Sequence, residues 1–189
     1  MTMIDQQVHR FTRDEYTRMA NAGLFNGQRV ELLAGEVLDM PPQNEPHVES
    51  VSAIGRFLIG HLGKEWQVRM QAPLAVAEDS APEPDFGVVP TAPPRANAPT
   101  SAVLAIEVAD SSIARDRRKA GFYAGAGIPE YWIVHVAARR IIQHTGPRVD
   151  PRQEGGGRYQ TITTLTPTQF LRCTTLPLPA VKVASLLKE

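Results

Sequence analysis

Residues 101–109 are the segment of this 189-residue chain that most constrains its fold. Their sequence, SAVLAIEVA, is apolar at odd and even positions alike, and only Glu107 interrupts it. Because the side chains of a strand alternate between the two faces of its sheet, this run is typical of a central strand covered on both sides. The segment therefore predicts a sheet with helices on both faces.

Helical and strand patterns flank this segment. Apolar residues recur at helical spacing between residues 45 and 64, which predicts the longest helix of the fold. A capping box at Thr12 and Glu15 predicts a short helix that ends near Gly23. The order of elements favours an α/β fold with a mixed sheet flanked by helices. The remaining predicted elements are strands over 29–33, 36–40, 66–70, 73–77, 85–89, 131–136, 139–144 and 158–163, a proline-rich loop over 90–100, capping residues at 110–112, a helix over 115–126 and a short helix over 181–187.

Length and composition bound the class of protein. A chain of 189 residues suits one domain, which we predict over residues 1–189. Hydrophobic residues make up 42% and charged residues 21%, which excludes disordered, collagen-like and coiled-coil chains. Since 20 Lys and Arg balance 20 Asp and Glu, histone-like binding is excluded and a nucleic-acid partner requires a local basic patch.

The sequence also indicates a compartment. The single cysteine, Cys173, excludes an intrachain disulfide, and the first residues lack the apolar run of a signal peptide. No apolar stretch approaches the roughly 18 residues that a membrane-spanning helix needs. We therefore expect a soluble, cytoplasmic protein with no membrane partner. Zinc is not expected, because the cysteine and the histidines lack ligand spacing.

Glu107 is the first candidate for chemistry. Burying an ionised carboxylate without a partner costs several kcal/mol, so it must pair with a cation or coordinate a metal ion. Asp85 begins another apolar strand, and if the two strands are neighbours, both carboxylates lie at one sheet edge. Hard cations such as Mg²⁺ prefer such oxygen ligands. The alternatives for Glu107 are a structural ion pair with an arginine or a strand end that reaches solvent, and for Asp85 a role at a strand start or in a turn.

Lys119 is the second candidate, because arginine supplies most of the positive charge of this chain. Its predicted helix follows the Glu107 strand, which brings it back toward the same sheet edge. A compact ammonium can position or polarise a water molecule. The alternative is a solvated helix lysine. At an exposed position, Lys119→Met would change the stability of the fold by no more than about 0.5 kcal/mol.

Several blocks of the sequence together resemble the Uma2 family of the PD-(D/E)xK restriction-endonuclease-like superfamily. The resemblance is strongest over residues 10–145, where Pro84 and Asp85 resemble the PD element and Glu107 the acidic position of (D/E)xK. The blocks are residues 30–37 (VELLAGEV), 46–47 (PH), 80–85 (SAPEPD), 106–112 (IEVADSS), 116–119 (DRRK) and 122–134 (FYAGAGIPEYWIV).

The resemblance implies a restriction-endonuclease-like fold and a metal-dependent endonuclease that hydrolyses phosphodiester bonds, with DNA as the expected substrate. In such a site, Asp85 and Glu107 bind Mg²⁺ or Mn²⁺ together with the backbone carbonyl of Val108. Lys119 then orients the attacking water or stabilises the developing charge.

Two further candidates rest on the same resemblance. Glu31 matches the family's early glutamate and would bind a second ion or a water molecule. His47 matches the family's histidine and would contact a phosphate or act as a base. The alternatives are an exposed strand residue opposite Glu36 for Glu31 and a surface residue for His47.

The sequence departs from the family pattern. Ala109 replaces the lysine expected two residues after Glu107, and the resemblance implies that Lys119, four residues before Tyr123, takes over. Asp116 precedes Lys119 by three residues, one fewer than the family spacing. Two family aspartates are replaced, by Ala34 in the hairpin turn and by His135 after the YWIV run.

The helix that carries Lys119 is also basic. Its arginines, and two on the next pair of strands, are candidates for binding a nucleic-acid backbone, and a solvated helix face is the alternative. Gln71 is a further candidate for the catalytic cleft. Residues 155–157 are three glycines, which predict a flexible turn and not a phosphate loop. The arginines are Arg115, Arg117, Arg118, Arg139 and Arg140.

Other functions stay open at this point. A non-catalytic module that binds nucleic acid or a partner protein would suit the changes at Ala109 and His135. A structural subunit of a mobile-element or toxin–antitoxin system is another alternative. We also expect a homodimer, because the strands after Tyr131 and the C-terminal region offer apolar surface and enzymes of this superfamily often pair to cut two strands.

Overall fold

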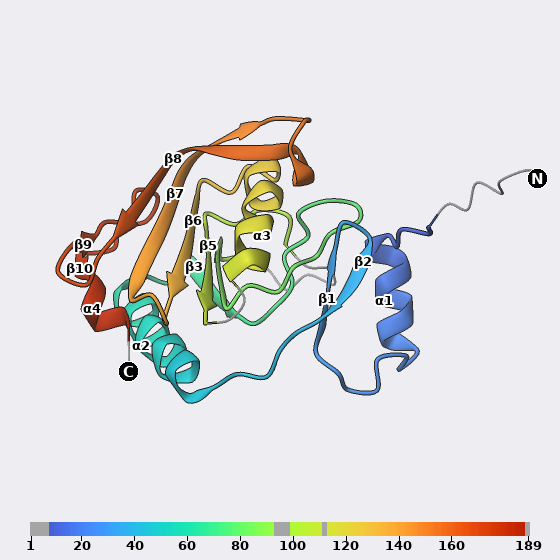
Figure 1. Cartoon of the computed structure of the whole chain (residues 1–189), viewed down its shortest axis with the longest axis horizontal. Coiled ribbons are helices and arrows are strands. Elements are labelled where there is room, and N and C mark those ends of the chain that lie inside the picture. Colours follow the sequence, from blue (N-terminus) through green and yellow to red (C-terminus); the bar gives the residue numbers. More distant parts are fainter. Residues whose placement is uncertain (1–7, 93–98, 111–112, 188–189) are drawn as a thin grey trace, which may run out of the picture.

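The computed structural model describes residues 8–92, 99–110 and 113–187 (Figure 1). Its centre is a six-stranded sheet in the order β3-β4-β5-β6-β7-β8. Only β5 and β6 run parallel, and α3 connects them; the other neighbouring pairs are antiparallel. The strands of this sheet are β3 (Trp66–Met70), β4 (Phe86–Pro90), β5 (Leu104–Ala109), β6 (Glu130–His135), β7 (Arg140–Val149) and β8 (Gly157–Leu165).

The remaining elements surround this sheet. Two small antiparallel sheets, β1–β2 and β9–β10, lie beside it. None of the described helices is long and apolar enough to cross a membrane. These elements are α1 (Arg13–Asn21), β1 (Val30–Leu33), β2 (Glu36–Asp39), α2 (Glu45–His61), α3 (Ile113–Gly125), η1 (Glu154–Gly156), β9 (Phe170–Leu171), β10 (Val181–Lys182) and α4 (Val183–Leu186).

The central strand is β5, and every one of its residues is buried. Leu104 and Ile106 pack on one face with α2 and α4, whereas Ala105 and Ala109 pack on the other face with α3. Figure 1 shows α2 and α4 on one side of the sheet and α3 on the other. The prediction of a strand covered on both sides is confirmed, although the strand begins three residues later than predicted. The odd-numbered Glu107 therefore lies on the α3 side.

The β1–β2 hairpin is held beside α3 by the loop before β4. Ala81 forms a bridge with Leu32, and the Ser80 hydroxyl accepts a hydrogen bond from the backbone N–H of Ala34 at 2.9 Å. The predicted capping box of α1 is present, and the Tyr16 hydroxyl of this helix donates to the Val30 carbonyl at 2.8 Å. This packing fixes β1, the strand that carries a site residue.

The glycines at 155–157 are more than the flexible turn that the sequence predicts. A Cβ atom on Gly121 of α3 would lie 2.1 Å from the Glu154 carbonyl oxygen, and one on Gly157 would lie 2.2 Å from the Gly125 nitrogen. Gly155 also has a positive φ of 80°. The helix and the loop therefore approach backbone to backbone, which only glycine allows.

Residues 73–77 do not form the predicted strand. Leu74 and Ala75 are buried, but their N–H groups donate to the carbonyls of Pro82 and Pro99, both at 3.0 Å, in loops. The neighbouring prolines have no N–H groups with which to continue a ladder. The capping residues 111–112 and residues 93–98 of the proline-rich loop lie outside the described residues.

Glu130, at the start of β6, fastens the C-terminal segment to the sheet. One oxygen of this fully buried carboxylate accepts hydrogen bonds from the Trp132 indole and the Gln143 amide, both at 2.6 Å. The other oxygen accepts the backbone N–H and the hydroxyl of Thr174, both at 2.7 Å, and the Thr175 hydroxyl at 3.3 Å. We call this group the Glu130 knot; its hydrogen bonds satisfy the buried carboxylate, which makes no ion pair with any described residue.

Candidate active site

The residues predicted for catalysis and metal binding converge on one pocket with a volume of about 60 Å³. They come from β1, the start of α2, the residue before β4, β5 and α3. The pocket is therefore built by segments that lie far apart in the sequence. The predicted residues in its lining are Glu31, His47, Asp85, Glu107, Val108 and Lys119.

Lys119 lies between two buried glutamates. Its Nζ atom is 2.9 Å from Oε1 of Glu107 and 2.8 Å from Oε2 of Glu31. The exposed fractions are 2% for Lys119, 5% for Glu107 and 0% for Glu31. Tyr123, one helical turn after Lys119, donates its hydroxyl to the same Oε1 of Glu107 at 3.0 Å. Lys119 thus reaches Glu107 from α3, while Ala109 is buried in the apolar cluster beneath that helix.

The alternatives that place Lys119 and Glu31 on the exposed surface are wrong. Lys119 is not a solvated helix lysine, so Lys119→Met removes a buried ion pair and does not leave the stability unchanged. Glu31 is not an exposed residue opposite Glu36, because the hairpin register pairs it with Leu38. The loop over the hairpin buries Glu31, and the Glu83 N–H donates to its Oε2 at 3.1 Å.

The charges of this group depend on one another. Burial raises the pKa of Glu107 well above its usual 4.5, Lys119 opposes this shift, and the nearby carboxylates add to it. Burial alone would lower the pKa of Lys119, but the surrounding carboxylates, Glu107 first, outweigh it and raise that pKa. Lys119 is therefore protonated at neutral pH. Burial also raises the pKa of Tyr123, so its hydroxyl keeps the proton that it donates.

Asp85 is held from several directions. Its Oδ2 accepts the backbone N–H of Val108 at 2.8 Å and lies 3.5 Å from Nε2 of His47. Gln71 donates its amide to Oδ1 at 3.3 Å, so this candidate contacts Asp85 although it does not line the pocket. Because Val108 directly follows Glu107 in β5, the bond to its N–H brings the two acidic residues to the same part of the sheet. His47 is positioned by the first turn of α2, where its N–H is capped by Asn44.

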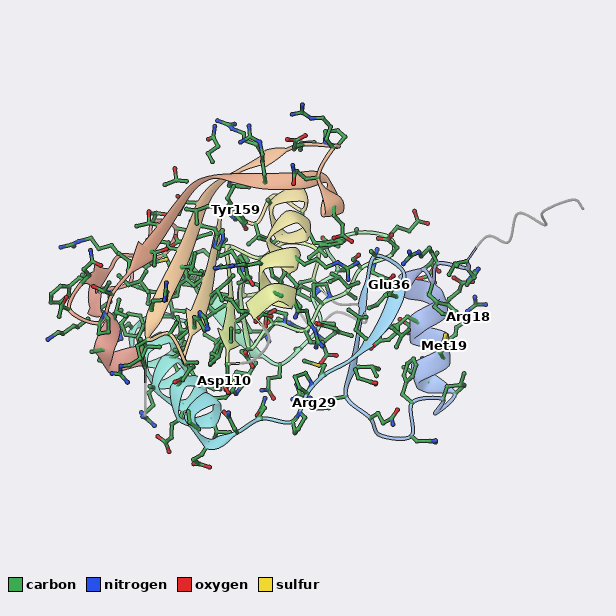
Figure 2. The ribbon with its side chains drawn as sticks, in the orientation of Figure 1. Arg18, Met19, Arg29, Glu36, Asp110 and Tyr159 are labelled. Atoms are coloured by element: carbon green, nitrogen blue, oxygen red, sulfur yellow. The ribbon has the colours of Figure 1, made fainter. Side chains whose placement is uncertain are left out.

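The segment between β2 and α2 forms one wall of the pocket. The Arg115 guanidinium donates to the Asp39 carbonyl at 3.0 Å at one end of this segment, and Asn44 donates to Asp110 at 2.6 Å at the other. Arg29 also lines the pocket. Figure 2 shows Arg29 and Asp110 along the edge of the molecule where this segment runs. Arg29 and Arg115 are thus the cations at the mouth.

The predicted nucleic-acid-binding arginines do not form one surface. Arg115 lines the pocket, but Arg118 is held by both oxygens of Glu154 at 2.6–3.0 Å. Arg117 is exposed and lines a second cavity, together with Arg118. Successive helix residues point about 100° apart, so α3 distributes these side chains around its axis. Arg139 and Arg140 lie in or next to the β6–β7 turn, and neither lines the pocket.

Two charged residues of the pocket were not assigned a role from the sequence. Asp116, whose spacing to Lys119 differs from the family pattern, is 3% exposed and lines the pocket as another acidic group. Arg29 enters the lining from the residue before β1. Asp116 could have been found as a residue one helical turn from Lys119, whereas Arg29 carries no local sequence signal.

The comparison with known proteins decides the family. A family model described as "Uma2: Putative restriction endonuclease" matches residues 13–183. The chain belongs to the Uma2 family. Membership places it with the restriction-endonuclease-like nucleases, and the match continues beyond the region where the sequence resemblance is strongest. No curated protein matches the chain.

A solved structure shows the same fold. It is that of "a putative nuclease belonging to DUF820" from Anabaena variabilis ATCC 29413, with a TM-score of 0.69 and 13% sequence identity. The match covers 93% of this chain and 97% of that chain. It confirms the predicted mixed sheet flanked by helices for this Uma2 protein.

The donor set of the Uma2 pocket suits a hard divalent ion. Asp85, Glu107 and the Val108 carbonyl offer oxygen ligands, and Oε1 of the buried Glu31 has no hydrogen-bond partner in the described part of the chain. Among the described residues there is no group of three or more His, Cys, Asp and Glu side chains arranged around a common metal position. Two carboxylates with water in the other positions are the usual protein ligands of Mg²⁺.

Proposed function

We propose that this protein is a divalent-metal-dependent endonuclease that hydrolyses phosphodiester bonds of DNA. The observation that carries the proposal is the buried group of Lys119, Glu107 and Glu31, together with Asp85 at one end of the sheet. A purely structural site would satisfy its polar atoms, whereas this site leaves one buried carboxylate oxygen, Oε1 of Glu31, without a partner among residues 8–92, 99–110 and 113–187.

The residues of the chain have separable tasks in this reaction. Asp85 and Glu107 would hold Mg²⁺ or Mn²⁺ with the Val108 carbonyl, and a bound divalent ion polarises the phosphate and lowers the pKa of a water molecule. Lys119 stays protonated and supplies positive charge near the place where negative charge develops. Glu31 holds Lys119 in place and offers its free Oε1 to a water molecule.

Other residues bind and orient the substrate. His47 lies 3.5 Å from Asp85 and would contact a phosphate oxygen or accept a proton from water. Arg29 and Arg115 at the mouth would bind the flanking phosphates of the strand. The overall charge of the chain is zero, so these local cations carry the attraction.

A cleavage assay tests the proposal. Supercoiled plasmid, linear duplex, single-stranded DNA and RNA are incubated with the protein in Mg²⁺, Mn²⁺ or EDTA. We expect DNA cleavage that requires the metal and that Asp85→Ala abolishes, while Glu49→Gln, at an exposed carboxylate of α2, cleaves like the parent. Metal-independent binding without cleavage, unchanged in Asp85→Ala, would instead favour the non-catalytic module.

We also propose that the enzyme works as a homodimer, because two copies can cut the two strands of a duplex. Tyr131, Trp132, Ile133 and Val134 of β6 are all fully buried and offer no such surface. Further along the suggested region, Val149 of β7 is 77% exposed and Phe170 of β9 is 58% exposed. The proposal rests on these exposed apolar side chains and on the superfamily. Sedimentation equilibrium is expected to give twice the protomer mass of 20.7 kDa, and a particle of the protomer mass at micromolar concentration would contradict it.

A further inference from the structure

A second cavity lies on the other side of α3 from the catalytic group. It has a volume of about 560 Å³, within the usual range for small-molecule sites. Its walls come from α3, the segment at η1, and strands β7 and β8. Tyr159 of β8, labelled in Figure 2 close to α3, is part of this wall. The close contact of α3 with residues 154–157 fixes one side of the cavity.

One guanidinium at this cavity is available to a ligand. Arg118 is held by Glu154 and Glu36, and Arg158 lies 3.3 Å from Asp150. Arg117 is exposed and makes no ion pair with any described residue. An arginine without a carboxylate partner can bind an anion, and its planar fork suits a phosphate group.

The opposite wall is apolar and aromatic. Ile162 of β8 is 61% exposed, and beside it lie the buried Ile142 and Tyr159. Tyr159 donates its hydroxyl to the Ile128 carbonyl at 2.9 Å, so its ring is fixed. A large exposed aliphatic side chain next to a cation gives a surface on which a flat ring can pack while an attached anion reaches the arginine.

His144 adds a buried polar group to the same wall. It is 4% exposed, and its Nδ1 atom has no hydrogen-bond partner among the described residues. Burial lowers the pKa of this imidazole, so the ring is neutral at pH 7. A neutral ring can take part in a hydrogen bond with a ligand without adding charge. Nothing in the nuclease chemistry uses this residue.

We propose that this cavity binds a small anion that carries an aromatic ring, of the size and chemistry of a mononucleotide. The phosphate binds Arg117, and the ring packs on Ile162 and Ile142. The site is separate from the catalytic pocket, because none of these residues lines that pocket. Since α3 carries Arg117 and Lys119 two residues apart, both sites share one helix.

Calorimetric titration of the full chain with AMP tests this proposal, in EDTA so that no divalent ion contributes. We expect saturable binding of AMP that is weakened about tenfold or more by Arg117→Gln, which removes charged hydrogen bonds to the phosphate, and by Ile162→Asn, which removes apolar surface from the ring. Arg140→Gln, at an exposed arginine elsewhere, and Asp85→Ala, in the catalytic pocket, are expected to bind like the parent.

Three results would overturn the proposal. The first is the absence of AMP binding to a parent protein whose thermal unfolding shows that it is folded. The second is binding that Asp85→Ala removes and Arg117→Gln keeps, because AMP would then occupy the catalytic pocket. The third is inorganic phosphate binding as tightly as AMP, since no ring would then contribute. Weaker binding of phosphate and of adenosine than of AMP supports the proposal.

Discussion

The molecule buries two glutamates on neighbouring parallel strands in opposite ways. Glu130 of β6 accepts hydrogen bonds only from neutral groups, and both of its oxygens have close donors. Glu107 of β5 faces a protonated lysine and other carboxylates, and Glu31 in the same group keeps an oxygen with no partner. Among the described residues, the hydrogen bonds of the Glu130 carboxylate are therefore satisfied, whereas those of the carboxylates around Lys119 are not.

This difference separates a structural role from a catalytic one. Saturating an anion with fixed neutral donors gives stability and leaves no capacity for a ligand. Burying Glu107 raises its pKa, Lys119 opposes this shift, and the nearby carboxylates add to it. Such an arrangement costs stability, which a protein keeps where chemistry needs it. We therefore expect substitutions in the Glu130 knot to change stability, and substitutions around Glu107 to change cleavage.

The largest effect is expected for cleavage by Glu107→Gln. This variant keeps the shape of the side chain but removes the charge that would hold the divalent ion. Single-turnover cleavage of plasmid DNA should slow by about a thousandfold, or about 4 kcal/mol in activation free energy. Glu130→Gln, measured at an equal folded fraction, should cleave within about threefold of the parent. Equal losses of cleavage rate in both variants would contradict the assignment of a catalytic role to Glu107 and a structural role to Glu130.

The next effect is on stability, for Glu130→Ala. Removal of the carboxylate leaves the buried Trp132 indole, the Gln143 amide and the Thr174 N–H without their acceptor. The indole is fully buried and its loss of an acceptor costs about 1–3 kcal/mol, whereas the half-buried Gln143 and the exposed Thr174 can turn to water, so the free energy of unfolding should fall by about 3 kcal/mol. Urea denaturation monitored by tryptophan fluorescence measures this change. A loss below about 1 kcal/mol would mean that the knot is not what fastens the C-terminal segment.

Lys119→Met should lower both the stability of the fold and the rate of cleavage. The variant leaves two buried carboxylates without their cation, so the free energy of unfolding should fall by about 3 kcal/mol at pH 7. Cleavage by the folded fraction should slow by about a hundredfold. Lys119→Arg should not restore full cleavage, because the guanidinium has a different shape and cannot occupy the same position between the glutamates. Parent-like cleavage by Lys119→Met would require another cation in the reaction.

The smallest expected effect is on how the free energy of unfolding depends on pH. Because Glu107 has a pKa above 4.5 in the folded state, the folded protein binds this proton more tightly than the unfolded chain. The free energy of unfolding of the parent therefore loses this contribution as pH rises from 4.5 through the raised pKa. Glu107→Gln lacks it, so its stability relative to the parent should increase with pH, by at most about 1.4 kcal/mol per pH unit.

Urea titrations in metal-free buffer at several pH values between the usual pKa and neutrality measure this difference. The same titrations of Glu49→Gln control for an exposed carboxylate. A stability difference between Glu107→Gln and the parent that stays constant, or that decreases with pH, would show that burial does not raise the pKa of Glu107.

Local patterns were sufficient to predict most of the fold and the members of the pocket. The apolar run around Glu107 was enough to predict that its strand is buried on both faces. The capping box of α1 and the helical period of α2 could likewise be recognised from residues close together in the sequence. Asp85 and Lys119 were candidates from their places in the sequence, which the family motifs supported, whereas Glu31 and His47 were identified through those motifs. These predictions depend on short stretches of chain, which is why they could be made before the structure.

What could not be predicted depends on contacts between distant segments. The burial of Glu31 requires the loop before β4 to cover the hairpin. The packing of residues 155–157 requires Gly121 of α3, from which they are separated in the chain by β6 and β7. The knot around Glu130 needs Thr174, which is 44 residues further along the chain. The failed strand over 73–77 has the right composition, but its hydrogen-bond partners lie in loops.

Calorimetric titration with Mn²⁺ tests the central comparison most directly. The parent, Glu107→Gln and Glu130→Gln are titrated in the same buffer, with circular dichroism to confirm that each is folded. We expect the parent and Glu130→Gln to bind the ion with the same affinity, and Glu107→Gln to show no saturable binding. Equal binding by all three proteins, or binding lost only in Glu130→Gln, would contradict the assignment of Glu107 to the metal-binding centre and of Glu130 to the fold.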